Sequence, residues 1–144
     1  MTNASAEYFQ SPVRCPIKQG QLDLLLAGRD PFDDPTIWER CFRAHGVTLN
    51  TVISVRRILS DILEVDLFQI RARDSLYTKE LSFLWDLDSL ADLKIMHALE
   101  VEFNITISDA EAEALKSLRD IVLAVHAKIT ARPSVPLQTA TAQI

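Results

Sequence analysis

The tripeptide Asp-Ser-Leu occurs twice in this 144-residue chain, at residues 74–76 and 88–90. A serine hydroxyl can act as a nucleophile or as the point at which another group is attached. Ser89 stands at the head of an apolar pattern with helical spacing, where unpaired backbone N–H groups and the helix dipole favour a negative group. A phosphodiester on Ser89 would therefore be well placed. Ser75 has no long amphipathic helix behind it, so we expect it to be a turn or cap residue.

Catalysis by either serine would need an oriented base nearby, and the sequence offers none. His45, His97 and His126 are isolated, and no Asp-x-x-His accompanies either tripeptide, which counts against a Ser/His/Asp hydrolase. Cys15 and Cys41 belong to no CxxC or Cys/His pattern, so we expect two reduced thiols and no metal site. We therefore predict no catalytic residue.

The elements that must position Ser89 are helices, because residues 50 to 130 contain neither glycine nor proline. Apolar spacing predicts helices at about 50–64, 89–103 and 117–129, the first capped by Asn50. Ser108 and Glu111 have the spacing of a capping box for a short helix at 109–115. The second helix has a predicted inward stripe of Leu90, Leu93, Met96, Leu99 and Phe103.

A long connection, residues 65–88, joins the first two of these helices. Such a loop is usually functional or internally packed. Its apolar residues are expected to anchor it across the bundle: Leu67, Ile70, Leu76, Leu81, Phe83, Leu84 and Trp85. Trp85 could pack under a bound group, but packing within the loop is the favoured interpretation.

The flanking segments differ in composition from the middle. Residues 1–49 hold four of the six prolines and all three glycines, and they predict only short helices at 19–27 and 35–44, the second capped by Asp34. This extension could be a docking element, a lid on the bundle or a linker. We predict a division into the extension at 1–49, a domain at 50–130 and a disordered tail at 131–144.

The formal net charge is −5, which disfavours binding to nucleic acid and suits partners with basic patches. Residues 50–130 alone carry nine basic and fourteen acidic side chains, a balance of −5. No apolar run approaches the ~20 residues that span a bilayer, and the first ten residues do not resemble a secretory signal. We expect a cytoplasmic monomer.

The stretch that begins Asp88-Ser89-Leu90-Ala91-Asp92-Leu93-Lys94-Ile95 resembles the acyl carrier protein family. It continues through Ala98-Leu99-Glu100-Val101-Glu102-Phe103 and Ile107-Ser108-Asp109. In that family a DSL serine opens a helix that ends in an acidic, acidic, Phe run, and a short third helix and a fourth follow. The resemblance covers about residues 50–130 and nothing in 1–49.

The resemblance implies an all-α fold: a four-helix bundle of three main helices and one short helix, with a partly helical or irregular N-terminal extension. It implies a covalent 4'-phosphopantetheine arm on Ser89, with Asp88 and Leu90 completing the attachment motif. The arm would hold acyl intermediates as thioesters and present them to enzymes of fatty acid, lipid or polyketide-type synthesis. The chain would be a non-catalytic substrate of a phosphopantetheinyl transferase.

The same resemblance implies two further sets of residues. The partner-docking face, which would meet basic patches on acyl-loading and acyl-using enzymes, consists of Asp92, Lys94, Glu100 and Glu102. The acyl-pocket candidates are Leu93, Met96, Leu99, Phe103 and Ile107.

The chain departs from the family pattern at two positions near Ser89. Asp86 replaces the usual glycine two residues before the motif, and Lys94 replaces a usual acidic residue. A reversed charge can change which partner docks, so we expect a specialised carrier with its own partners. Two alternatives stay open: a carrier-fold interaction module without the arm, and a small hydrolase that uses Ser89.

Overall fold

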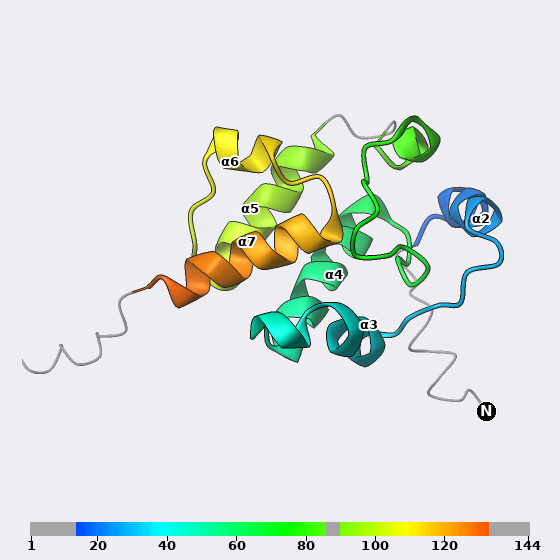
Figure 1. Ribbon diagram of the computed structural model, residues 1–144. Helices are drawn as coiled ribbons and strands as arrows, with labels where there is room; N and C mark the ends of the chain where they lie inside the picture. Colours follow the sequence, from blue (N-terminus) through cyan, green and yellow to red (C-terminus); the bar gives the residue numbers. More distant parts are fainter. Residues whose placement is uncertain (1–13, 86–89, 133–144) are drawn as a thin grey trace, which may run out of the picture.

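The computed structural model describes residues 14–85 and 90–132, and this part of the chain is helical with no extended strand (Figure 1). The predicted all-α class is confirmed. The elements, in order, are α2 (Pro16–Leu25), α3 (Asp34–Cys41), η1 (Arg43–His45), α4 (Leu49–Leu63), η2 (Lys79–Leu84), α5 (Ala91–Phe103), α6 (Asp109–Glu113) and α7 (Leu118–Thr130). The four helices from α4 to α7, without η2, correspond to the predicted bundle of three main helices and one short helix.

Four of the six described α-helices, α3, α4, α6 and α7, begin where a side-chain oxygen accepts a backbone N–H. The predicted capping box is confirmed at α6, where Ser108 and Glu111 exchange hydrogen bonds. The predicted caps of the two earlier helices are wrong by one or two residues. Thr48 caps α4 through the Thr51 N–H at 3.2 Å, and Asp33 caps α3 through the Thr36 N–H at 2.9 Å. Each true cap has the extended backbone that a cap requires.

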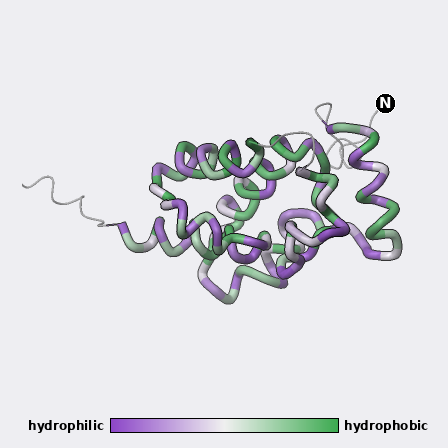
Figure 2. The backbone as a smooth tube through the Cα atoms, turned by 90° about the horizontal axis from the view of Figure 1, so that it is seen from above, coloured by the Kyte–Doolittle hydropathy of each residue, from purple (hydrophilic) through white to green (hydrophobic). Residues whose placement is uncertain are grey.

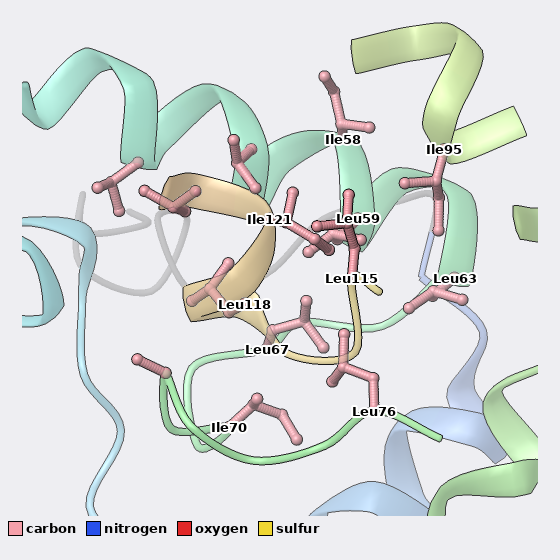
Figure 3. Packing of buried hydrophobic residues seen from close by; sticks show 14 of the residues in the cluster. Ile58, Leu59, Leu63, Leu67, Ile70, Leu76, Ile95, Leu115, Leu118 and Ile121 are labelled. Atoms are coloured by element: carbon pink, nitrogen blue, oxygen red, sulfur yellow. The ribbon is translucent and has the colours of Figure 1, made fainter. Parts of the chain in front are cut away.

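Helix α4 lies at the centre of the molecule and contacts α3, α5 and α7 (Figure 1). Its apolar residues Val52, Val55, Leu59 and Leu63 are fully buried. Figure 3 shows Leu59 of α4 close to Ile121 of α7, with Ile95 of α5 beyond. This arrangement buries apolar side chains on more than one side of α4.

The predicted inward stripe of α5 is wrong at its first two positions. The side chains of Leu90 and Leu93 are 53% and 64% exposed, whereas Ala91, Ile95 and Leu99 are buried. Residues four apart share a face of a helix that turns about 100° per residue. The buried face therefore runs through Ala91, Ile95 and Leu99, and Leu90 and Leu93 fall on the opposite side.

The connection between α4 and α5 is packed against the bundle, as its apolar residues predicted. Leu67, Ile70 and Leu76 are buried and point toward the core in Figure 3. Leu81 and Leu84 are buried on η2, a 3₁₀ segment that the sequence did not predict. The loop is therefore fixed by side chains along most of its described length.

The N-terminal extension joins the same hydrophobic cluster. Leu22 of α2, together with Ile37 and Phe42, has almost no exposed side chain and packs in one core with α4. The two predicted short helices exist, although α2 begins at Pro16 and α3 ends at Cys41, where η1 replaces its last turn. The division of the chain at residues 49 and 50 stays a prediction.

The hydropathy of the tube in Figure 2 alternates within each helix, with hydrophobic and hydrophilic residues on opposite sides of most turns. Such alternation is typical of helices that have one buried side and one in water. None of the described helices is both long enough and apolar enough to cross a membrane.

Candidate functional site

Ser89, Asp88 and Asp86 lie outside the described residues, and the structure describes the chain on either side of them, up to Trp85 and from Leu90. Helix α5 begins at Ala91, two residues after Ser89, with Leu90 at the N-cap position. A leucine side chain has no oxygen that could accept a first-turn N–H group. Because such N–H groups and the helix dipole favour a negative group, the start of α5 fits a phosphate attached just before it.

The loop that precedes this site is tied to the first turn of α5. The rings of Tyr77 and Trp85 stack with centroids 4.6 Å apart and planes at 12°. The Tyr77 hydroxyl donates a hydrogen bond to the carboxylate of Asp92, and the Trp85 indole N–H donates to the Leu76 carbonyl at 2.8 Å. Trp85 therefore packs within the loop. Burial, and then the neighbouring Asp92 carboxylate, raise the pKa of Tyr77, so its phenol stays a donor.

The second tripeptide, at residues 74–76, has a structural role at each position. Asp74 accepts the Arg71 N–H and pairs with Arg29 at 2.6 Å. The Ser75 hydroxyl accepts the Tyr77 N–H at 3.3 Å, and Ser75 forms an isolated antiparallel bridge with Ser117. Leu76 is buried. The prediction that Ser75 is a turn residue is confirmed.

Of the predicted docking residues, Asp92 bonds to Tyr77 and the other two carboxylates are also held within the molecule. Glu100 accepts the Ile107 N–H at 2.8 Å. Glu102 lies near α4, where Arg57 is 3.4 Å away. Residues 92 and 102 therefore flank the buried side of α5. Its outer face also carries three exposed side chains that the sequence prediction did not assign to docking, Leu93, His97 and Val101. Of the predicted docking residues, Asp92, Lys94 and Glu102 are exposed.

The sequence matches the family described as "Phosphopantetheine attachment site" over residues 54–125, which is half of the chain. The chain belongs to the acyl carrier protein family. This match begins in α4, ends in α7 and includes Ser89.

Curated acyl carrier proteins from three bacteria are similar to the same part of the chain. The protein of Thermosynechococcus vestitus is 37% identical over 79 residues, which cover 54% of this chain and 89% of that protein. The protein of Helicobacter hepaticus is 33% identical over 81 residues, covering 55% and 97%. The protein of Wolinella succinogenes is 39% identical over 67 residues, covering 45% and 88%. No solved structure matches the chain significantly.

As a member of this carrier family, the chain carries a covalently attached 4'-phosphopantetheine. The described residues fit such a group because α5 starts immediately after the motif, and the side chain of its N-cap residue, Leu90, has no atom that can accept a first-turn N–H. The competing serine of the carrier domain, Ser75, already uses its hydroxyl as an acceptor within a turn.

The acyl-pocket candidates of the carrier occupy different environments. Leu99 is fully buried, and Met96, Phe103 and Ile107 are partly buried against the core. Leu93 is exposed, so its predicted inward position is wrong for the same reason of helical phase as at Leu90. A cavity of about 350 Å³ lies between α6 and α7, and its apolar lining includes the candidate Ile107 together with Leu115, Ala124 and Ala127.

Sequence reasoning did not assign a role to Tyr77 or to Lys116, whose ammonium lies 4.8 Å from the centre of the Tyr77 ring. The composition of the connection between α4 and α5 could have pointed to Tyr77. Tyr77 and Trp85 are aromatic side chains with a polar atom, in a connection whose other apolar residues are mostly aliphatic. Such residues usually place that polar atom against a partner when they are buried.

Proposed function

We propose that Ser89 carries the arm and that this chain is an acyl carrier for enzymes of fatty acid, lipid or polyketide-type synthesis. The observation that carries the proposal is the position of Ser89. It lies inside the matched segment and two residues before the first residue of α5. When bound, the arm supplies a terminal thiol on which an acyl group can be held as a thioester.

The residues of the chain position this arm and supply no acid or base. The start of α5 stabilises the negative phosphodiester electrostatically. The hydrogen bond from Tyr77 to Asp92 fixes the preceding loop against the first turn of that helix. Asp88 and Leu90 complete the motif that a phosphopantetheinyl transferase reads, and Leu90 is half-exposed, where a partner enzyme can touch it.

Partner enzymes dock on the outer side of α5 in this proposal. Leu93, His97 and Val101 form an exposed, mostly apolar strip, and Lys94 is exposed beside it. Asp92, Glu100 and Glu102 lie at the margins and contribute negative potential to basic patches on partners. Lys94 adds a positive charge near the attachment site and selects for partners that tolerate it. The carrier acts as a monomer.

The acyl chain shelters against the partly buried side chains of Met96, Phe103 and Ile107, with Leu99 behind them. These side chains contact the core without being fully enclosed, so small movements could admit a cargo. Leu93 belongs to the docking strip and not to this pocket.

Intact-mass measurement tests the attachment residue directly. The full chain, Ser89→Ala and the matched Ser75→Ala variant are each incubated with coenzyme A and a phosphopantetheinyl transferase, beside a control carrier. We expect one phosphopantetheinyl addition on the wild type and on Ser75→Ala, and none on Ser89→Ala.

Equal masses for the wild type and Ser89→Ala, while the control carrier is loaded, would reject the arm on Ser89. An interaction module without the arm would then be the better interpretation. Esterase activity that is lost in Ser89→Ala without any added mass would support a hydrolase.

A further inference from the structure

A polar cleft of about 340 Å³ opens where the loop after α4 meets the start of α7. Its lining consists of Arg73, Ser75, Lys116, Ser117, Arg119 and Asp120. The volume is at the lower end of the range for small-molecule sites. Three of the six lining residues are cations, in a carrier domain whose net charge is negative.

None of the described carboxylates forms an ion pair with the three cations of this cleft. Among the described residues, the side chains of Arg73, Lys116 and Arg119 form no ion pair with a carboxylate, whereas Arg56, Arg57 and Lys128 each do. The one acid in the cleft, Asp120, accepts the backbone N–H groups of Lys116 and Ser117 at 3.0 and 3.2 Å. Its charge is thereby directed toward the backbone, and the cleft keeps an excess of positive charge.

The two walls of the cleft are held together by backbone hydrogen bonds. Leu76 N–H donates to the Lys116 carbonyl at 2.7 Å, and Arg119 N–H donates to the Ala72 carbonyl at 2.8 Å. The antiparallel bridge between Ser75 and Ser117 lies between these two bonds. The cationic side chains therefore project from a fixed frame, which lowers the entropic cost of binding a ligand.

The cleft is connected to the first turn of α5 through Tyr77. The Lys116 ammonium lies over the ring of Tyr77, whose hydroxyl bonds to Asp92 in the first turn of α5. A single aromatic ring thus links the cationic cleft to the helix that Ser89 precedes. The cleft is thus connected through described contacts to the first turn of the helix that Ser89 precedes.

We propose that this cleft binds an oxyanion, and that the oxyanion is the terminal carboxylate or phosphate of a cargo held on the arm. Two guanidinium groups and an ammonium suit such groups because they offer several charge-assisted donors. The proposal about the source of the anion rests on the proposed carrier function, whereas the binding site itself does not. If the proposal is right, the acyl groups that this carrier holds end in a carboxylate or a phosphate.

Titration of the full-length Ser89→Ala chain with inorganic phosphate tests the site without the arm. Backbone amide NMR shifts of Ser75, Lys116 and Arg119 report on binding at fixed ionic strength. We expect saturable shifts at these residues and a dissociation constant raised at least about tenfold in Arg73→Gln/Arg119→Gln, since two charge-assisted contacts are lost.

The matched control removes two exposed cations elsewhere, in Arg57→Gln/Lys79→Gln. It should change the dissociation constant by less than about threefold, because neither side chain lines the cleft and salt screens charges that do not contact the ligand. The absence of saturable shifts in the cleft, or an equal weakening in both double variants, would overturn the site.

The source of the anion is tested on the armed chain loaded with either a succinyl or a butyryl group. Succinyl cargo should shift the amides of Ser75, Lys116 and Arg119, and butyryl cargo should not. The succinyl shifts should vanish in Arg73→Gln/Arg119→Gln. Phosphate binding without succinyl shifts would overturn the cargo assignment and leave a free anion as the ligand. Failure to load Ser89 would refute the carrier function, and the phosphate titration would still decide the site.

Discussion

Arg56 offers the sharpest test of how the extension is joined to the carrier bundle. Its guanidinium, on α4, is almost fully buried and donates to Asp34 of α3 at 2.7 Å. It also donates to the carbonyls of Phe32 at 3.0 Å and Leu67 at 3.2 Å. One side chain thus connects the extension, the central helix and the loop that leads to the attachment site.

Replacing Arg56 by alanine leaves the Asp34 carboxylate without its arginine and takes a donor away from the carbonyls of Phe32 and Leu67, of which Leu67 keeps the Ile70 N–H. Breaking a buried ion pair by removing one partner costs about 3–5 kcal/mol. For a chain of this size that corresponds to a fall in Tm of roughly 10–15 °C. Lysine at this position keeps the charge but not the forked donors, so it should cost about half as much.

The neighbouring Arg57 provides the control, because it lies on the same helix and carries the same charge. Its guanidinium is half-exposed and 3.4 Å from Glu102, a geometry that contributes at most about 1 kcal/mol. Urea unfolding followed by circular dichroism measures both Arg56→Ala and Arg57→Ala. Similar small losses for the two variants, with unchanged slopes, would refute the role given to Arg56.

Other expectations concern α5 and α6. Leu99→Ala should cost about 2–5 kcal/mol, because the side chain is fully buried, whereas Leu93→Ala should cost less than about 0.5 kcal/mol; equal losses in urea unfolding would contradict the revised phase of α5. A double-mutant cycle of Tyr77→Phe and Asp92→Asn should give a coupling of about 0.5–3 kcal/mol, and a coupling near zero would mean that the loop is not held there. The backbone N–H at the start of α6 and a nearby lysine lower the pKa of Glu111 from 4.5 to about 2. A lowered folded-state pKa means that its stabilising contribution is complete above pH 4.5 and is lost as the pH falls toward 2; an NMR titration with a midpoint near 4.5 would contradict this cause.

The bundle could be predicted from the sequence because its helices have clear periods and capping signals. Ser108 with Glu111, and the run from Leu118 onward, carry enough local information to place α6 and α7 within two residues. The inward face of α5 could not be assigned, because apolar residues occur on both of its sides. Leu90 and Leu93 continue one apolar stripe, and Ile95 and Leu99 belong to another. Only the position of α4 decides which stripe is buried.

Around the candidate site, the sequence indicated the serine but not its neighbours. A tripeptide and the following helix are local features, so residues 88–90 could be singled out without any structure. The contact of Tyr77 with Asp92 joins residues fifteen positions apart, and the cleft combines Arg73 with Arg119. Such pairs depend on how the loop folds back on α7, which no local pattern specifies.

The central position of α4 has a consequence for the order in which the chain is made. Leu22, Ile37 and Phe42 leave the ribosome before α4, the helix that covers them, and α7, which covers another side of α4, follows later. At about 5–20 residues per second, the 88 residues from Phe42 to Thr130 take roughly 4–18 s to synthesise. For that interval the nascent extension presents apolar side chains without a complete core. The extension therefore depends on residues translated after it to cover its apolar side chains, and a chaperone that binds nascent chains would meet Leu22, Ile37 and Phe42 while they are still exposed.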